Sequence, residues 1–302
     1  MKYINDPKTN CSLIEFEYTS DFSPFGARRF SWSFLRGINK EFDINYIYLL
    51  RNQGEYDTIT FNNNGNMCLL CSNGDYAISA DTLDKSELVI SEDNRRGVLI
   101  TGKNQIKATS TFLSGDLLVI SEDPVEEFGE CALSVNELYD AIFMIESSVE
   151  AKIIKLYDYS LFSKNGIMDN LIWVFDDYFK FKNTFRGMYM HIAPRDGIRI
   201  LTCIKGSVDV YITNVVDEAK ESYVIRLDDS AKSLCIDGKY AVGVHSLSDD
   251  TLVNQLRREY MDAKYTKRLG LKCCDKALAL NKDDLIMSIL DRTADETEDI
   301  HV

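Results

Sequence analysis

The stretch CLLCSNGDYAIS (residues 68–79) consists of an apolar strand, a turn at Gly74 and a strand with alternating side chains. The stretch LTCIKGSVDVYIT (residues 201–213) repeats this pattern with Gly206 at the turn. Two further pairs follow in the same order, VLITGK (98–103) with LCIDGK (234–239) and LSGDLLV (113–119) with LSDDTLV (247–253). The offset stays between 132 and 136 residues. Constant order and spacing indicate two copies of one structural unit.

Short strand-like runs separated by turn residues dominate both copies. Examples are residues 46–50 and 117–121 in the first copy, and 188–192 and 223–227 in the second. Many short strands at this spacing are typical of all-β sandwiches and barrels. We therefore predict an all-β protein with two tandem antiparallel barrels.

The segment between the copies has a helical pattern, because Leu138, Ile142 and Ile145 share one face of a helix. A second helical pattern covers residues 283–291. The predicted organisation is an N-terminal barrel at 1–133, a linker helix at 134–150, and a C-terminal barrel with a short helix and an acidic tail at 151–302.

The 302 residues carry a formal net charge of −14. A surface this acidic repels phosphate backbones and anionic membranes, so we expect neither nucleic-acid nor membrane partners. The N-terminal residues have no signal-peptide pattern, and no apolar run reaches the roughly 18 residues of a membrane span. Eight irregularly spaced cysteines then predict reduced thiols and a cytoplasmic location.

The second copy resembles the nucleotide-sugar 3,5-epimerases of the cupin superfamily over about residues 153–262. FRGMYMH (185–191) is similar to the family's L-R-G-L-H-Y-Q strand, and RILTCIKG (199–206) to its K-L-V-R-V-x-R-G strand. VGVHSLSD (242–249) is similar to the segment that ends A-H-G-F-L-V-L-S-D. The resemblance implies a cupin-like jelly-roll barrel.

The first copy resembles the sister group, the nucleotide-sugar 3,4-ketoisomerases, over about residues 12–125. The similarity lies in FDINYIYL (42–49) and in the hairpin at 69–78. The strand that carries two histidines in that group corresponds to residues 57–63, which contain none. In the second copy the family's catalytic histidine falls on Tyr189 and its acid tyrosine near Gln255. The resemblance thus extends to the fold but not to the catalytic residues.

Tyr189 and His191 are the candidate catalytic residues. Side chains of a strand alternate between faces, so these two share one face, and the resemblance directs that face into the barrel. A Tyr–His pair there could move protons. The alternative is a histidine that is merely hydrogen-bonded in a partly buried barrel mouth.

Arg186 and Arg199 are the candidate substrate-binding residues. The resemblance places them at positions that contact the phosphates of a nucleotide sugar, and guanidinium groups suit bidentate phosphate contacts. The alternative is an ion pair at the surface or at a dimer interface.

No metal and no cofactor are predicted. The three histidines, His191, His245 and His301, are scattered, and a metal-binding cupin needs a histidine cluster. The pair Cys68 and Cys71 lies alone on one predicted strand, which favours core packing.

Two functions remain open. The first is an epimerase or isomerase with altered catalytic residues that acts on a nucleotide-linked 4-keto-6-deoxy sugar in surface-polysaccharide biosynthesis. The second is a non-catalytic, degenerate tandem cupin that binds a sugar nucleotide or partners an active enzyme. Barrels of this family usually pair, and a tandem chain could satisfy that pairing internally or dimerise again; we expect a homodimer.

Overall fold

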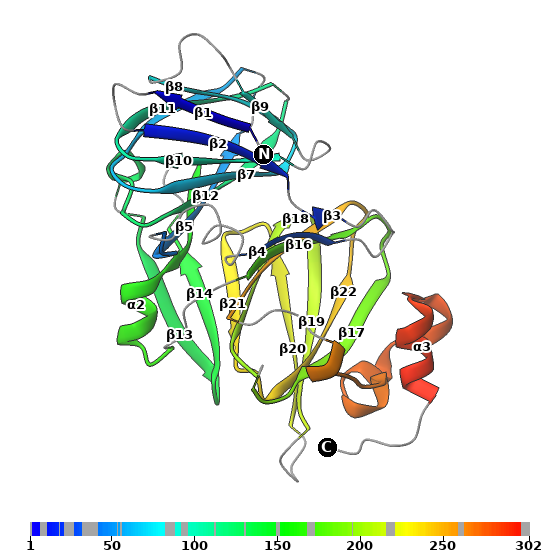
Figure 1. Cartoon of the computed structure of the whole chain (residues 1–302). Coiled ribbons are helices and arrows are strands. Elements are labelled where there is room, and N and C mark those ends of the chain that lie inside the picture. The colour runs from blue at the N-terminus through cyan, green and yellow to red at the C-terminus, as the bar shows by residue number, and fades with distance from the viewer. Residues whose placement is uncertain are drawn as a thin grey trace. The chain divides into compact units, whose positions relative to one another are not determined.

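The structure, a computed structural model, divides the chain into two compact units that are built almost wholly of strands (Figure 1). It describes the chain except residues 1, 7–10, 18, 21–26, 32–41, 53, 55, 82–87, 92–95, 112, 130, 149–151, 168–172, 195, 216–220, 259–262 and 297–302. Each unit is discontinuous in sequence. The first comprises Met1–Ser20, Arg28–Ser134 and Ser147–Asn170, and the second Asp21–Ala27, Val135–Glu146 and Leu171–Val302.

The first unit contains two antiparallel sheets. The larger has the strand order β1 (Lys2–Asp6), β2 (Cys11–Glu17), β10 (Arg96–Thr101), β7 (Met67–Asn73), β12 (Gly115–Ser121), β5 (Tyr46–Asn52) and β15 (Ile153–Asp158). The smaller has the order β6 (Thr58–Asn63), β11 (Asn104–Ser110), β8 (Asp75–Ala80) and β9 (Leu88–Ser91). A short 3₁₀ turn, η1 (Glu126–Phe128), follows β12.

Both sheets contribute to the core of the first unit. Leu69 of β7 and Ile78 of β8 are fully buried in it, one from each sheet. The alternate side chains of β7, such as Cys68 and Leu70, are also buried. A strand buried on both faces needs apolar residues at every position, which explains the continuous run CLLC.

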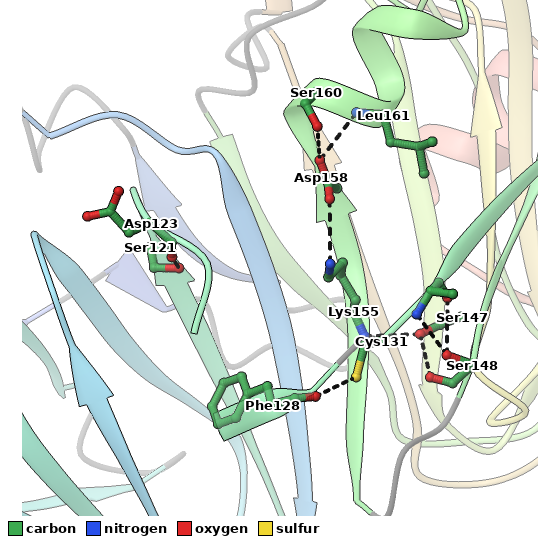
Figure 2. A network of polar contacts seen from close by, with 11 residues as sticks. Ser121, Asp123, Phe128, Cys131, Ser147, Ser148, Lys155, Asp158, Ser160 and Leu161 are labelled. Atoms are coloured by element: carbon green, nitrogen blue, oxygen red, sulfur yellow. Dashed lines mark hydrogen bonds and ion pairs between the residues drawn. The ribbon is translucent and has the colours of Figure 1, made fainter. Parts of the chain in front are cut away.

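The end of β15 and the start of α2 (Tyr159–Lys164) are joined by a helix cap (Figure 2). Asp158 accepts hydrogen bonds from the Leu161 amide (3.2 Å) and the Ser160 hydroxyl (2.8 Å). Its other oxygen pairs with Lys155 Nζ at 3.5 Å. An aspartate at this position satisfies an amide at the helix start that has no partner within the helix.

Two further sheets contain the strands of the second unit. In the larger, the strands of this unit have the order β13 (Leu133–Tyr139), β14 (Ile142–Ser147), β21 (Lys232–Ile236), β18 (Arg199–Lys205), β23 (Thr251–Arg257) and β16 (Trp173–Phe179). The smaller has the order β20 (Ser222–Asp228), β19 (Ser207–Asn214), β22 (Tyr240–Ser246), β17 (Thr184–His191) and β24 (Thr266–Arg268), with β25 (Ile286–Met287) parallel to β17. The predicted all-β fold with two barrel-like units is thereby confirmed.

One face of the smaller sheet meets the larger sheet in a shared core that includes Leu201, Val242 and Val253. Its other face carries a second apolar cluster, in which Phe185 and Met188 of β17 pack with the segment that follows β24. That segment contains the 3₁₀ turns η3 (Leu271–Cys273), η4 (Ala277–Ala279) and η5 (Lys282–Asp284), and η2 (Ala263–Tyr265) precedes β24. β17 therefore lies between two cores. Some of its side chains face the core between the two sheets, and the others face the second apolar cluster.

The predicted linker helix is wrong, because residues 134–150 contain the hairpin of β13 and β14. β14 pairs with β21 in register, with Ile142 opposite Ile236. Ile142 and Ile145 are buried as the helical pattern required, but Leu138 is 39% exposed. Backbone pairing with an existing sheet thus outweighs a weak helical periodicity.

The predicted C-terminal helix is present as α3 (Ile289–Glu296), but it begins later than residue 283. Residues 286–287 instead extend the smaller sheet as β25. Neither α2 nor α3 has the length and apolarity needed to cross a membrane, and the same holds for every helix among the described residues.

The turn between β13 and β14 gives a test of the hairpin. Ala141 has a φ of 56°, a conformation that costs an L-residue about 1–2 kcal/mol and that glycine adopts freely. Ala141→Gly should therefore raise the free energy of unfolding by about 0.5–1 kcal/mol, measured by urea denaturation. In a helix the same change would lower it by about 1 kcal/mol. Ala132→Gly, at an exposed position without positive φ, is the control that should not stabilise.

Candidate functional site

Polar side chains continue the inner core of the second unit toward one end of its strands. Arg199 lies on the same face of β18 as the core residue Leu201, because side chains alternate along a strand. Gln255 and Arg257 follow Val253 on the core-facing side of β23 in the same way. Arg199 and Arg257 are direct cross-strand partners. Two guanidinium groups thus lie side by side on the inner face.

A register shift in β17 adds two more polar side chains. Arg186 pairs with Val244 and Tyr189 with Val242, and both valines belong to the inner core. Side chains three residues apart would face opposite sides of a regular strand, and the shift between them brings both inward. Gly187 makes the shift possible, since its φ is 125° and a Cβ there would lie 2.5 Å from the Cα of Gly243.

Hydrogen bonds connect these side chains into a continuous network. Arg186 forms an ion pair with Asp177 of β16, and the amide of Gln255 donates to the second oxygen of that carboxylate. Arg257 donates to Gln255 Oε1 at 3.0 Å and to the Nε2 atom of His191. Burial lowers the pKa of Arg186, but the charges of Asp177 and Asp291 outweigh this effect and raise it. Arg186 therefore remains a cation within this network.

His191 is a neutral hydrogen-bond acceptor in this network. Arginine can only donate, so Nε2 carries the lone pair that accepts from Arg257. The proton is then on Nδ1, which lies 3.2 Å from the hydroxyl of Thr266. Burial lowers the pKa of His191, and the charges of Arg257 and Arg199 lower it further. His191 has no free lone pair with which to accept a proton from a substrate.

Tyr189 is a protonated donor. Its hydroxyl donates to Asp291 Oδ1 at 2.7 Å, and the guanidinium of Arg268 lies over its ring at 5.5 Å. Burial raises the pKa of Tyr189, and the neighbouring charge of Asp291 raises it further. Tyr189 and Asp291 therefore form a buried phenol–carboxylate pair.

Arg199 is a buried cation without a matching anion. Its side chain is only 2% exposed, and its terminal nitrogens donate to the backbone carbonyls of Tyr189 (3.3 Å) and Tyr240 (3.4 Å). No carboxylate of the described residues forms an ion pair with Arg199, and its Nε atom has no hydrogen-bond partner among them. Burial lowers the pKa of Arg199, as does Arg257, while Asp237 opposes the shift. This is the strongest electrostatic imbalance of the site.

We call the following set the polar cluster: Asp177, Arg186, Tyr189, His191, Arg199, Gln255, Arg257, Arg268 and Asp291. It contains four guanidinium groups and two carboxylates. An excess of positive charge in a chain with a net charge of −14 marks a place suited to an anionic ligand.

The four site residues predicted from the sequence all belong to the polar cluster, but they have different partners. Tyr189 is bonded to Asp291 and His191 to Arg257, so no hydrogen bond joins the two. His245 lies instead near the rings of Phe185 and Tyr211, on the other side of the sheet. His301 lies outside the described residues.

Sequence reasoning missed Asp177, Arg257 and Asp291. Asp176 and Asp177 are each only 6% exposed. The alternation of Phe175, Asp177 and Phe179 was the signal that placed Asp177 on an inner face. Among the residues that the structure describes, no group of three or more His, Cys, Asp or Glu side chains is placed to hold a metal ion.

No protein-family model and no curated protein matches the chain. Among solved structures, the chain is similar to dTDP-4-dehydrorhamnose 3,5-epimerase from Bacillus anthracis with TDP and PPi bound. The match covers 53% of this chain and 97% of the epimerase chain, with 18% sequence identity and a TM-score of 0.48. A 3,5-epimerase from Legionella pneumophila in complex with dTDP-4-keto-L-rhamnose matches 54% of the chain, at 15% identity, 92% of its own length and a TM-score of 0.47.

A third similar structure is a 3'-monoepimerase from Streptomyces bikiniensis in complex with dTDP-quinovose. The match covers 54% of this chain and 79% of the monoepimerase chain, with 12% sequence identity and a TM-score of 0.42. The resemblance expected from the sequence is thus present among solved structures over about half the chain. At these identities it concerns the fold alone.

The neutral state of His191 predicts a pH dependence of stability. Below its ordinary pKa of about 6.5 this histidine binds a proton in the unfolded chain but not in the folded one, so stability falls as the pH falls. Between about pH 7.5 and about pH 5.5, the wild type should lose about 1.4 kcal/mol more free energy of unfolding than His191→Gln. His245 is present in both proteins and cancels. Equal losses in urea titrations at the two pH values would contradict the assignment.

Proposed function

We propose that the second unit binds a nucleotide-linked sugar, with the ligand's phosphates at the polar cluster. The observation that carries this proposal is Arg199, a guanidinium that is 2% exposed and forms no ion pair with a described carboxylate. Burying an uncompensated charge costs several kcal/mol. A phosphate beside Arg199 would offset that cost.

The resemblance of residues 199–206 to the epimerase strand supports a nucleotide sugar over a simple anion, because the family's residue at this position contacts the ligand's phosphate. Arg186 corresponds to a second contact, although in this structure it is paired with Asp177. The sugar class that follows from the resemblance is a 4-keto-6-deoxy sugar. For an enzyme, the corresponding role is a cytoplasmic step in surface-polysaccharide biosynthesis, and a homodimer is proposed for either function.

The hydrogen bonds of the site favour binding over turnover by the two candidate catalytic residues. Epimerisation beside a ketone needs a base that accepts a carbon-bound proton. His191 already accepts from Arg257, and Tyr189 is a donor whose pKa is raised by burial. Neither offers a base at neutral pH, so a sugar-nucleotide-binding protein is our first proposal.

The pair of Tyr189 and Asp291 supports a second candidate, an epimerase or isomerase with altered catalytic residues. A phenol proton next to a buried carboxylate is an arrangement that can deliver a proton. Nearby guanidinium groups would stabilise negative charge on an enolate oxygen.

Calorimetric titration with a panel of nucleotide-linked 4-keto-6-deoxy sugars tests the first proposal. Arg199→Met keeps an unbranched side chain but removes the guanidinium group and its charge, and it should weaken binding by about 1.5–3 kcal/mol, the usual range for a hydrogen bond to a charged group. Arg226→Met is the matched control. Arg226 pairs with Asp209 (2.9 Å) and its side chain is 66% exposed, so its removal should leave affinity unchanged. Equal affinity of wild type and Arg199→Met would reject the proposal.

Incubation of the same sugars in D₂O separates the two candidates. If the protein only binds, we expect no deuterium at C3 or C5 of the sugar by mass spectrometry. Incorporation that disappears in Tyr189→Phe would establish the epimerase or isomerase instead, because that variant removes only the phenol proton donor.

A further inference from the structure

Among the side chains of the C-terminal helix α3 that the structure describes, the buried one is a carboxylate. The helix lies beside β17 within the second unit (Figure 1). Among its side chains described by the structure, those of 290–294, only Asp291 is buried, at 1% exposure. Leu290 next to it is 57% exposed. Among these described side chains, the polar contacts of Asp291 are therefore the buried link between α3 and the sheet.

The surroundings of Asp291 are those of a bound anion. Oδ1 accepts the hydroxyl proton of Tyr189 at 2.7 Å. Oδ2 is also buried, yet it has no hydrogen-bond partner among the described residues. The charge of Asp291 acts on Arg186 and Tyr189, and Arg268 stacks on the Tyr189 ring. The carboxylate is thus held by one hydrogen bond from Tyr189 and by the nearby charge of Arg186, a setting that could also hold a ligand's phosphate.

A ligand anion and Asp291 disfavour each other at this site. Like charges within about 4–6 Å repel strongly when they are shielded from water. A phosphate brings at least one negative charge to a cluster in which the charge of Asp291 already acts on Arg186. Full access of the phosphate to Arg186 is therefore favoured when the carboxylate leaves.

The chain is anchored to β17 through β25 as far as Met287, so release of α3 would turn about Ser288 and would also break the bond from Arg292 to the Leu285 carbonyl (3.0 Å). At the helix start, the amide of Asp291 donates to the Ser288 hydroxyl (3.1 Å), and the amide of Arg292 donates to the Ser288 carbonyl (3.0 Å). These bonds lie within the helix and its first turn and survive undocking. The bond between Asp291 and Tyr189 is one that undocking breaks, and a neutral hydrogen-bonded water can replace it at small net cost.

We propose that α3 is an intramolecular competitor for the anionic ligand, with Asp291 standing in for a phosphate until the ligand displaces it. This inference rests on the proposed function, because it presumes that the polar cluster binds a phosphate group. It goes further in assigning a regulatory role to the C-terminal helix.

The test is calorimetric titration of the full chain with inorganic pyrophosphate. Asp291→Asn keeps the shape and can still accept from Tyr189, but it lacks the charge. It should bind pyrophosphate about 3–10-fold more tightly than wild type, the effect of removing one modest like-charge repulsion. Asp275→Asn removes an exposed carboxylate from the same C-terminal region and should leave affinity unchanged. Unchanged or weaker binding by Asp291→Asn would overturn the proposal.

Hydrogen exchange on the wild-type chain gives a second measurement that needs no variant. Saturation with pyrophosphate should speed amide exchange in residues 289–296 about ten-fold or more, because displacement exposes the helix. Slower exchange would show that α3 closes over the ligand and would overturn the proposal. If wild type and Asp291→Asn both fail to bind pyrophosphate, the proposed function fails as well. If both bind equally and Arg199→Met weakens binding, only the role of α3 is rejected.

Discussion

The close approach of two backbone segments at Gly187 and Gly243 is the constraint on which the second unit depends. A Cβ on Gly187 would lie 2.5 Å from the Gly243 Cα, so neither a side chain nor an ordinary φ fits there. The register shift at this point lets Arg186 and Tyr189 face the same core, while Phe185 and Met188 fill the apolar cluster on the other side. One strand thereby serves a polar site and two cores at once.

The strands and turns were predictable because their signals are local. Alternation in residues 75–80 and 207–214, with a turn glycine before each, is enough to define a hairpin. The pairing of Tyr189 with Asp291 was not predictable, since 102 residues separate them and nothing in the sequence relates the two. The hairpin at residues 133–147 was missed for a related reason, because its pairing partner lies about 90 residues downstream.

The electrostatics of the polar cluster explain why its residue types suit a ligand better than they suit stability. Arg199 and Arg257 are cross-strand neighbours, an arrangement that repels in a site shielded from water. Apolar residues at these positions would continue the core defined by Leu201 and Val253 without this repulsion. Residues that destabilise the fold they sit in are expected where binding or catalysis requires them.

The discontinuity of the two units bears on how the chain folds during synthesis. β5 receives its second neighbour, β15, only when residues 153–158 have been made, whereas its first neighbour, β12, ends at Ser121. In the intervening hairpin of β13 and β14, the strand β14 can pair with β21 only after residues 232–236 have been made. A nascent chain therefore exposes open strand edges while translation continues, and open edges are the part of a sheet most prone to wrong pairing. The strand order thus leaves these edges unpaired for a longer part of synthesis than two sequence-contiguous units would.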